Sequence, residues 1–436
     1  GTLPEVFGRR LGSGAKNAGF HWIGEDDDTV LKAKFYSLAD MHQQALVMAR
    51  KIRKHAEVGE HVALIYPPSP DFIAAFLACL YAGVTGVPLA PLQPGAITET
   101  GLSRFNHILG DCGARLALTT PGYKTSFQLA VAASRITGRN LRILQVKWKA
   151  LGLVPARAAR QATKLAHVHE AHEDDVAYLQ YSSGSTSQPK GVMVTHRCVK
   201  QVLLRTLARH GMVGVPTFWF PPHWHDLGLV LAVNGGLLIY GQTWMMSPVT
   251  LVRKPGLVLE ALSVGKVEFT CLNNFALVHL WKHFGKRLPS PLPDLSRVRL
   301  FGLGGDFAYA SAIINADGLL GRMGMGCGTI SSTWGQAEST LNITTTPPEG
   351  YGPGRIFLHI DKAELLRANR VVVLRETPVL ATGLRAEDFE VGALGNELVL
   401  VSAGVPLTGL TVRVVDPVSH EELPPDGVGE LWVSGP

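Results

Sequence analysis

The chain has 436 residues, of which 46% are hydrophobic, 8% aromatic and 17% charged. This composition supplies a sizeable buried core and excludes a disordered chain or a coiled coil, and the length predicts about two or three structural units. Its 41 basic and 35 acidic side chains leave a net charge of +6, which is modest for this length and disfavours a nucleic-acid-binding protein.

An amphipathic helix is predicted near the start of the chain. Apolar residues recur at spacings of three and four from Leu38 to Ile52, and Ser37 and Asp40 are placed as a capping pair. Four basic residues cluster where this helix ends. Because cations are expected at a helix C-terminus, we interpret the cluster as a solvated helix end instead of a binding patch. The four are Arg50, Lys51, Arg53 and Lys54.

Short β-rich runs then alternate with helical patterns, which indicates a mostly parallel sheet covered by helices. The first set of runs occupies residues 61–66, 84–89 and 115–120, with a helix opened by Asp71. The second set occupies 176–181, 217–222, 267–272 and 298–303, with helices after Thr195 and at 256–264. From about residue 345 the chain becomes rich in Pro, Gly and β-like runs. The sequence therefore predicts an α/β protein with subdomains at 1–170 and 171–345 and a β-rich subdomain at 346–436.

Residues 227–252 carry no charge and have the length of a membrane span. Gly, Pro, Asn and Gln interrupt the run, so we expect a buried helix followed by a buried strand. The five cysteines are widely spaced and form no CxxC pair, which argues against a disulfide framework or a zinc ribbon. We expect a cytoplasmic protein without a membrane span.

A polar segment at 151–174 contains His167, His169, Glu170 and His172, which are close enough in sequence to suggest a metal site. No matching distant ligands are evident, so a solvated connection is the favoured interpretation.

The segment from Tyr181 to His196, YSSGSTSQPKGVMVTH, carries the strongest chemical signal. It leaves a β-run through a loop dense in hydroxyls and containing Lys190, and then enters a helical pattern. Small residues let backbone N–H groups approach an anion, and hydroxyls and an ammonium group add donors, so the loop predicts a polyphosphate site. It is not a Walker A loop, and the chain has neither a Rossmann fingerprint nor a GxSxG nucleophile elbow.

This segment closely resembles the phosphate-binding signature of the adenylate-forming superfamily, and further signatures follow in order. FPPHWHDLGL at 220–229 is similar to the second signature and STWGQAEST at 332–340 to the third, with Trp334 in place of the usual tyrosine. Segments at 66–91, 246–255 and 401–417 look like fatty acyl-AMP ligases. About 40 residues after Ile343 lie where those ligases carry an insertion that disfavours a CoA-dependent second step.

The resemblance implies an enzyme that activates a fatty or related carboxylic acid with Mg-ATP and passes the acyl group to the phosphopantetheine thiol of an acyl carrier protein. It implies the large domain of such an enzyme, for example in a loading module of a polyketide or peptide synthase. Phosphoryl transfer needs positioning and charge neutralisation, which agrees with the residue types.

The resemblance also assigns roles to individual residues. Thr186 and Glu338 match metal-associated positions for Mg²⁺, and with His225, beside the acyl carboxylate, they form the implied catalytic set. The implied substrate-binding residues are His225, Asp226, Asn274 and Phe275. The implied ATP-binding residues are Ser182, Ser183, Gly184, Ser185, Thr186, Lys190, Gly304, Gly305, Asp306, Trp334 and Gly335.

Three departures from the family pattern leave alternatives open. Ser187 and Gln336 replace the usual glycine and leucine, and residues 271–273 replace a stretch that is normally rich in glycine and proline. The family's small C-terminal domain, which carries the catalytic lysine, is not among these residues, so we expect the large domain alone to be impaired in catalysis. Truncation of that domain and its loss in evolution are both left open. The alternatives are an acyl- or aryl-CoA ligase, and a noncatalytic acyl- or nucleotide-binding module with the same fold.

Overall fold

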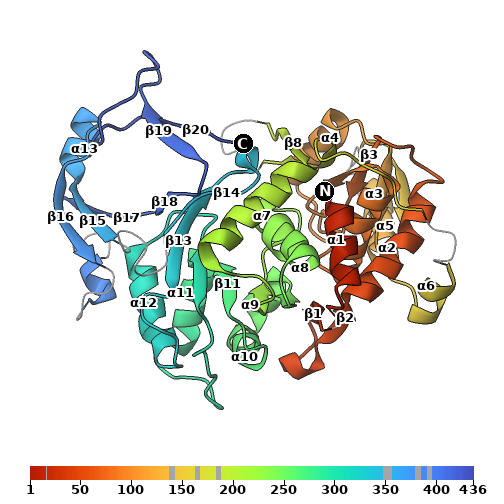
Figure 1. The fold of residues 1–436 in the computed structure, drawn as a ribbon, viewed down its shortest axis with the longest axis horizontal. Coiled ribbons are helices and arrows are strands. Elements are labelled where there is room, and N and C mark those ends of the chain that lie inside the picture. Colours follow the sequence, from red (N-terminus) through yellow and green to blue (C-terminus); the bar gives the residue numbers. More distant parts are fainter. Residues whose placement is uncertain are drawn as a thin grey trace. The chain divides into compact units, whose positions relative to one another are not determined.

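The computed structural model describes residues 1–15, 17–136, 143–162, 167–182, 188–346, 356–378, 384–389 and 395–436 (Figure 1). The chain forms two compact units, each assembled from separated segments. Unit 1 comprises Gly1–Gly24, Ala33–Leu203 and Pro221–Ser247, and unit 2 comprises Glu25–Lys32, Leu204–Phe220 and Pro248–Pro436. The division into subdomains at residues 170 and 345 stays a prediction.

The main sheet of unit 1 has the strand order β6-β5-β3-β4-β7-β8, and its neighbouring strands are parallel except for β7 and β8. In a smaller group, β1 pairs parallel with β10 and antiparallel with β2. The expected runs at 61–66, 84–89, 115–120 and 176–181 are confirmed as β3, β4, β5 and β7. The strands are β1 (Gly19–Ile23), β2 (Lys34–Ser37), β3 (His61–Leu64), β4 (Thr85–Pro88), β5 (Leu116–Thr119), β6 (Lys147–Ala150), β7 (Val176–Tyr181), β8 (Gly191–Thr195) and β10 (Gln242–Met246).

Helices connect these strands in the right order for a mostly parallel sheet. They are α1 (Leu3–Gly12), α2 (Leu38–Ile52), α3 (Pro70–Ala82), α4 (Glu99–Asp111), α5 (Pro121–Ile136), α6 (Ala156–Ala162), α7 (His196–His210) and α8 (Gly235–Leu238). The capping pair of α2 is confirmed, because the Asp40 N–H donates to Ser37 Oγ and the Ser37 N–H donates to Asp40 Oδ2, both at 3.1 Å. α2 packs on α3, in which every residue except Asp71 is buried. A helix that is apolar on all sides belongs in a protein core.

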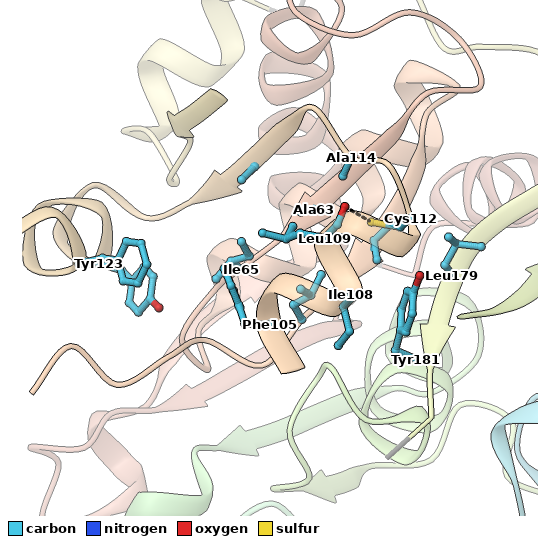
Figure 2. Close-up of a cluster of buried hydrophobic side chains, with 14 of the residues drawn as sticks. Ala63, Ile65, Phe105, Ile108, Leu109, Cys112, Ala114, Tyr123, Leu179 and Tyr181 are labelled. Atoms are coloured by element: carbon cyan, nitrogen blue, oxygen red, sulfur yellow. Dashed lines mark hydrogen bonds between the residues drawn. The ribbon is translucent and has the colours of Figure 1, made fainter. Parts of the chain in front are cut away.

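A hydrophobic cluster fills one face of the main sheet of unit 1 (Figure 2). It joins strand residues such as Ile65 and Leu179 to Phe105 and Leu109 of α4. Cys112 belongs to the cluster and its Sγ lies 3.7 Å from the Leu109 carbonyl oxygen, so this cysteine acts as a small apolar side chain. The cluster fixes α4 beside the carboxyl half of β7.

The uncharged stretch at 227–252 forms the predicted buried helix and strand. Its helix is a π-helix at Leu227–Asn234, followed by α8 and β10. The Asn234 side-chain amide donates to the Leu229 carbonyl five residues earlier, at 2.9 Å. Over the part of the chain that the structure describes, no helix has both the length and the apolar character needed to cross a bilayer.

Unit 2 contains a second mostly parallel sheet. Strands β9, β11, β12 and β13 run parallel, and β14 and β18 extend them antiparallel. These strands are β9 (Thr217–Trp219), β11 (Phe269–Leu272), β12 (Leu300–Leu303), β13 (Ile330–Gly335), β14 (Asn342–Thr345) and β18 (Val405–Pro406). The accompanying helices are α9 (Pro248–Arg253), α10 (Gly256–Val264), α11 (Asn274–Phe284) and α12 (Ala310–Gly321), with 3-10 turns at Val30–Lys32 and Ala337–Ser339.

The predicted β-rich C-terminal part is confirmed. An antiparallel sheet orders its strands β16-β15-β17, and β19 pairs with β20. The bounds are β15 (Ile356–Asp361), β16 (Val373–Pro378), β17 (Glu397–Val401), β19 (Thr411–Val415) and β20 (Glu430–Ser434). A short helix, α13 (Lys362–Ala368), and a 3-10 turn at Ala386–Phe389 were not expected from the sequence.

Candidate active site

The two ends of the predicted phosphate loop belong to a β-hairpin in unit 1. β7 ends at Tyr181, and the Ser182 N–H donates to the Lys190 carbonyl at 3.1 Å immediately before β8 begins. The helix predicted after Thr195 is confirmed as α7, which begins at His196. The strand before it, β8, pairs antiparallel with β7 and was not predicted. Four predicted binding residues lie outside the described residues, together with Ser187; they are Ser183, Gly184, Ser185 and Thr186.

Helix α4 contacts both ends of this loop. Arg104 Nη2 lies 3.5 Å from the Ser182 carbonyl oxygen, and His107 Nε2 lies 3.1 Å from the Pro189 carbonyl oxygen. One turn further on, the Tyr181 hydroxyl donates to Asp111 Oδ2 at 2.5 Å. Burial and the Asp111 carboxylate hold the pKa of Tyr181 above its ordinary value, so the hydroxyl remains a donor.

Sequence reasoning missed these three contacts. Arg104, His107 and Asp111 are spaced three and four residues apart, which places them on one side of a helix. That spacing was the available signal, but it says nothing about which strand or loop the polar side faces.

The second signature is folded tightly against β7 and α3. The buried His223 donates through Nε2 to the Tyr66 carbonyl at 3.0 Å and stacks on Phe72 with 3.7 Å between ring centroids. Burial lowers the pKa of His223 to about 3, so its ring is neutral. The Gln180 side-chain amide donates to the Trp224 carbonyl at 2.9 Å and ties this segment to β7.

His225 and Asp226 form a polar pair at the start of the π-helix. His225 Nδ1 lies 2.6 Å from Asp226 Oδ1, and the side chains are 49% and 14% exposed. The Leu227 N–H also donates to Asp226 Oδ1, at 2.6 Å, so the carboxylate caps the helix. The hydrogen bond to Asp226 raises the pKa of His225, and burial only partly opposes this effect. With Nδ1 directed at Asp226, Nε2 is the nitrogen available to a ligand.

Gly228 is required by the tight turn that precedes the π-helix. A Cβ atom at this position would lie 2.2 Å from the Pro222 carbonyl oxygen and 2.8 Å from that of Pro221. Glycine is therefore needed at this position of the second signature because two backbone segments approach each other closely there.

In unit 2 the other predicted residues collect at the carboxyl ends of three neighbouring parallel strands. Asn274 follows β11, Gly304 follows β12, and Trp334 lies near the end of β13. β12 pairs with both of the other strands. In open α/β sheets, ligands bind beyond the carboxyl ends of the strands. The arrangement thus fits a binding site at this edge.

The glycines at this edge allow the backbone to approach its neighbours. A Cβ atom on Gly304 would lie 2.8 Å from Thr333 Cγ2, and Gly305 adopts a φ of +83°. Asp306 is exposed, and its carboxylate accepts a hydrogen bond from the Phe307 N–H at 2.8 Å. A Cβ atom on Gly335 would meet the Leu341 carbonyl oxygen, so this glycine closes the turn between β13 and β14.

Asn274 and Phe275 have different surroundings. Asn274 is buried, its amide donates to the Phe307 carbonyl and its oxygen accepts from the Tyr309 N–H at 3.1 Å. It therefore fixes the segment after Asp306. Phe275 is 53% exposed and stacks on His279. The departure at 271–273 has a structural account, since Asn273 caps α11 by accepting from the Ala276 N–H at 3.1 Å.

Trp334 and Glu338 flank the turn that Gly335 closes. Trp334 is half-buried and pairs with Thr344 across the β13–β14 ladder. Glu338 is exposed in the 3-10 turn, and among the described residues no cation pairs with its carboxylate. Its oxygens are therefore open to a hard cation such as Mg²⁺.

The histidine-rich segment at 167–172 does not assemble a metal centre. Within the ranges that the structure describes, no three His, Cys, Asp or Glu side chains are grouped to hold a metal ion. The His169 ring instead lies against Gly83, and the His169 N–H donates to the Tyr81 carbonyl at 2.9 Å.

Known proteins resemble this chain in sequence and in fold. The sequence pattern of the family described as AMP-binding enzyme matches residues 24–365. The medium-chain-fatty-acid–[acyl-carrier-protein] ligase JamA of Moorena producens is 30% identical over 92% of this chain and 63% of its own. The long-chain-fatty-acid–AMP ligase FadD32 of Mycobacterium marinum is 27% identical over 88% of this chain and 56% of its own. The chain thus spans less than two thirds of the length of these relatives.

A putative fatty-acid–CoA ligase, FadD21 of Mycobacterium tuberculosis, is 25% identical over all of this chain and 70% of its own. Among solved structures, the fatty acyl-adenylate ligase from L. pneumophila in complex with acyl adenylate and pyrophosphate has a TM-score of 0.80 at 23% identity, covering 100% of this chain and 68% of its own. An adenylation domain of a keto acid-selecting NRPS module has a TM-score of 0.77 at 19% identity, covering 100% and 75%. The fold is that of the large domain of adenylate-forming enzymes, and the chain belongs to the AMP-binding enzyme family.

Proposed function

We propose that this chain carries the large domain of a fatty acyl-AMP ligase, which uses ATP to convert a fatty acid into an acyl adenylate. The observation that supports this most strongly is the family match over residues 24–365, together with relatives named as fatty acid–carrier and fatty acid–AMP ligases. In the reaction a carboxylate oxygen bonds to the α-phosphorus of ATP, and the bond to the pyrophosphate leaving group breaks. In the second step the phosphopantetheine thiol of an acyl carrier protein loses its proton and its sulfur bonds to the acyl carbon, while the bond from that carbon to the phosphate oxygen breaks and AMP leaves.

The roles of individual residues are part of this proposal. Lys190 and the hydroxyl-rich loop, from Ser182 through Thr186, would hold the phosphates. At the sheet edge of unit 2, Trp334 would stack on adenine while Gly304, Gly305, Asp306 and Gly335 shape its pocket. These assignments draw on the signature resemblance, and the described geometry is compatible with them.

We assign the fatty acid carboxylate to the neighbourhood of His225 and Asp226. The raised pKa of His225 increases the fraction of imidazolium, which attracts a carboxylate. Phe275 offers an exposed apolar surface for the acyl chain, and Asn274 would act by fixing the adjacent backbone. Mg²⁺ would be held by Glu338 and Thr186 and would neutralise phosphate charge.

The second candidate is a fatty acid–CoA ligase, which the similarity to FadD21 favours. Both candidates share the adenylation step and differ in the thiol that receives the acyl group. We further propose a cytoplasmic location, which agrees with five cysteines that are all free thiols.

A thermal-shift titration with nonhydrolysable octanoyl- and palmitoyl-adenylate analogues tests the binding site. A ligand present at about 100 times its Kd and bound only to the native state adds about 2.7 kcal/mol to the free energy of unfolding. We expect stabilisation that depends on acyl length, with a much smaller effect of AMP. No stabilisation by either analogue would contradict an acyl-adenylate site.

Mass spectrometry of the full-length protein with Mg-ATP and fatty acids tests the reaction itself. Acyl adenylate followed by transfer to a phosphopantetheinylated carrier protein supports the first candidate. Faster thioester formation with free CoA supports the second. Analogue binding without any adenylate formation would identify a noncatalytic binding module instead.

A further inference from the structure

A cavity of about 220 Å³ lies in unit 1, between the end of α2 and the edge strand β6. Its basic lining consists of Lys51, Lys54, His55 and Lys149. Because a water molecule occupies about 30 Å³ of the liquid, a cavity of this size suits a small organic molecule. None of the three signature segments contributes a residue to it.

The floor of the cavity is apolar. It is formed by Ile52 of α2, Leu116 and Leu118 of β5, and Leu151, all of which are buried. The strand register places Leu116 beside Lys147 and Leu118 beside Lys149. Directly paired residues project from the same face of a sheet, so a row of lysines stands next to a row of leucines.

In the part of the chain that the structure describes, the lysines around this cavity are not paired with acidic side chains. Within the described residues, Lys51, Lys54, Lys147 and Lys149 form no ion pair with a carboxylate, and Lys147 Nζ lies 3.3 Å from His55 Nδ1. Burial and then the charges of Lys147, Lys149 and Lys54 lower the pKa of His55. The ammonium groups therefore reinforce one another's potential.

Acidic residues do occur nearby in the sequence, at Glu57 and Glu60. The Glu60 carboxylate accepts a hydrogen bond from the Glu57 N–H at 2.9 Å. It serves that turn, and neither residue lines the cavity.

Two simpler explanations account for only part of this arrangement. The dipole of α2 places about half a negative charge at its C-terminus, which explains why Lys51 and Lys54 lie there. Half a charge does not balance the three positive charges of Lys51, Lys54 and Lys149. Lysines on an edge strand prevent pairing with other chains, which explains charge on β6. Neither explanation requires both sets of lysines to border one cavity with a leucine floor.

We propose that this cavity binds a small organic anion, with its phosphate or carboxylate group held by Lys51, Lys54 and Lys149 and its short apolar part on the leucine floor. Charge-assisted hydrogen bonds supply affinity for the anionic group, and the buried floor adds the contribution of apolar contact. The site does not depend on the proposed ligase activity.

Isothermal titration of the chain with octyl phosphate, octanoate and inorganic phosphate tests this site. Each titration is done in the presence of a saturating palmitoyl-adenylate analogue, which keeps the proposed active site filled. The variant K51Q/K54Q/K149Q removes the three cations. The control variant K282Q/K286Q/K362Q removes three exposed lysines elsewhere and matches the change in net charge.

We expect octyl phosphate or octanoate to bind, with affinity at least tenfold higher than that of inorganic phosphate. The triple cavity variant should lose at least tenfold in affinity, whereas the control variant should retain it. Equal binding of inorganic phosphate would contradict a role for the leucine floor. The proposal would be overturned if both variants had the same affinity for the probes, or if no probe bound the unmodified protein. Thermal unfolding of each variant verifies that it is folded.

Discussion

His223 and His225 stand two residues apart in the second signature but have opposite electrostatic environments. His223 is buried and hydrogen-bonded to a backbone carbonyl, and its pKa falls to about 3. His225 contacts the Asp226 carboxylate and its pKa is raised above 6.5. Of the two, only His225 therefore holds a proton more readily than a free histidine, which is the property needed beside a carboxylate substrate.

The variant Asp226→Asn tests this pairing. Removing the negative charge leaves burial as the main influence on His225, so its pKa should fall to 6.5 or below. NMR titration of the imidazole resonances measures the change. His223 is an internal control, since it should not titrate between pH 5 and 8 in either protein, and an unchanged pKa of His225 would show that Asp226 is not its partner.

Gly228 provides a second test at the scale of a single residue. In Gly228→Ala the added Cβ meets the Pro222 carbonyl at 2.2 Å, so the backbone has to shift and the free energy of unfolding should fall by about 3 kcal/mol. Urea denaturation measures this value. Gly8 in α1 is the matched control, because its Cβ position is open and Gly8→Ala should stabilise the helix by about 0.5–1 kcal/mol.

At the scale of elements, α4 connects the hydrophobic core to the phosphate loop. Its apolar side enters the core cluster through Phe105 and Leu109 (Figure 2). On its polar side, Arg104, His107 and Asp111 contact residues at the two ends of the loop. Core packing thereby fixes where the loop begins and ends. A loop with fixed ends loses less conformational freedom when a ligand binds.

The variant His107→Ala tests whether this connection affects ATP binding. Loss of the hydrogen bond to the Pro189 carbonyl should weaken ATP binding about threefold to tenfold, in keeping with about 0.5–1.5 kcal/mol for one such bond. Titration calorimetry measures Kd for Mg-ATP. His107→Gln keeps a donor and should recover affinity, and Ser103→Ala changes an exposed position on the same helix as a control. Equal affinity in all variants would limit α4 to a packing role.

At the scale of the whole molecule, buried neutral histidines link stability to pH. Burial lowers the pKa of His196 and His210 to about 4 and that of His223 to about 3. The unfolded chain binds these protons near pH 6.5, so between about pH 4 and 6.5 it holds more protons than the native state. The free energy of unfolding should therefore fall as the pH drops below 6.5.

The expected change is large enough to measure. Between pH 7 and pH 5, each of His196, His210 and His223 should lower the free energy of unfolding by about 2 kcal/mol. His225 offsets part of this loss, because its raised pKa acts in the opposite direction. Urea denaturation at both pH values provides the comparison. His196→Gln keeps an acceptor for the Leu3 N–H and should reduce the pH dependence, whereas the same slope in both proteins would contradict a neutral buried His196.

The local sequence determined most elements and all the signature segments. Period-two and period-3.6 patterns act over a few residues, which is why β7, α10 and the caps of α2 could be predicted closely. β8 was missed because its five residues directly follow the hydroxyl-rich loop and were counted with it. Residues 191–195 form a strand because they pair with β7, which precedes them in the chain.

Tertiary structure decided which of these elements meet. The units interleave distant segments, Arg104 and His107 reach a loop about 80 residues later, and Lys149 joins Lys51 at one cavity. Each contact depends on how whole helices and strands pack, so the local pattern around either partner does not encode it. The sequence by itself thus specified the chemistry of the signatures, while the tertiary structure alone specified which residues support them and where the basic cavity forms.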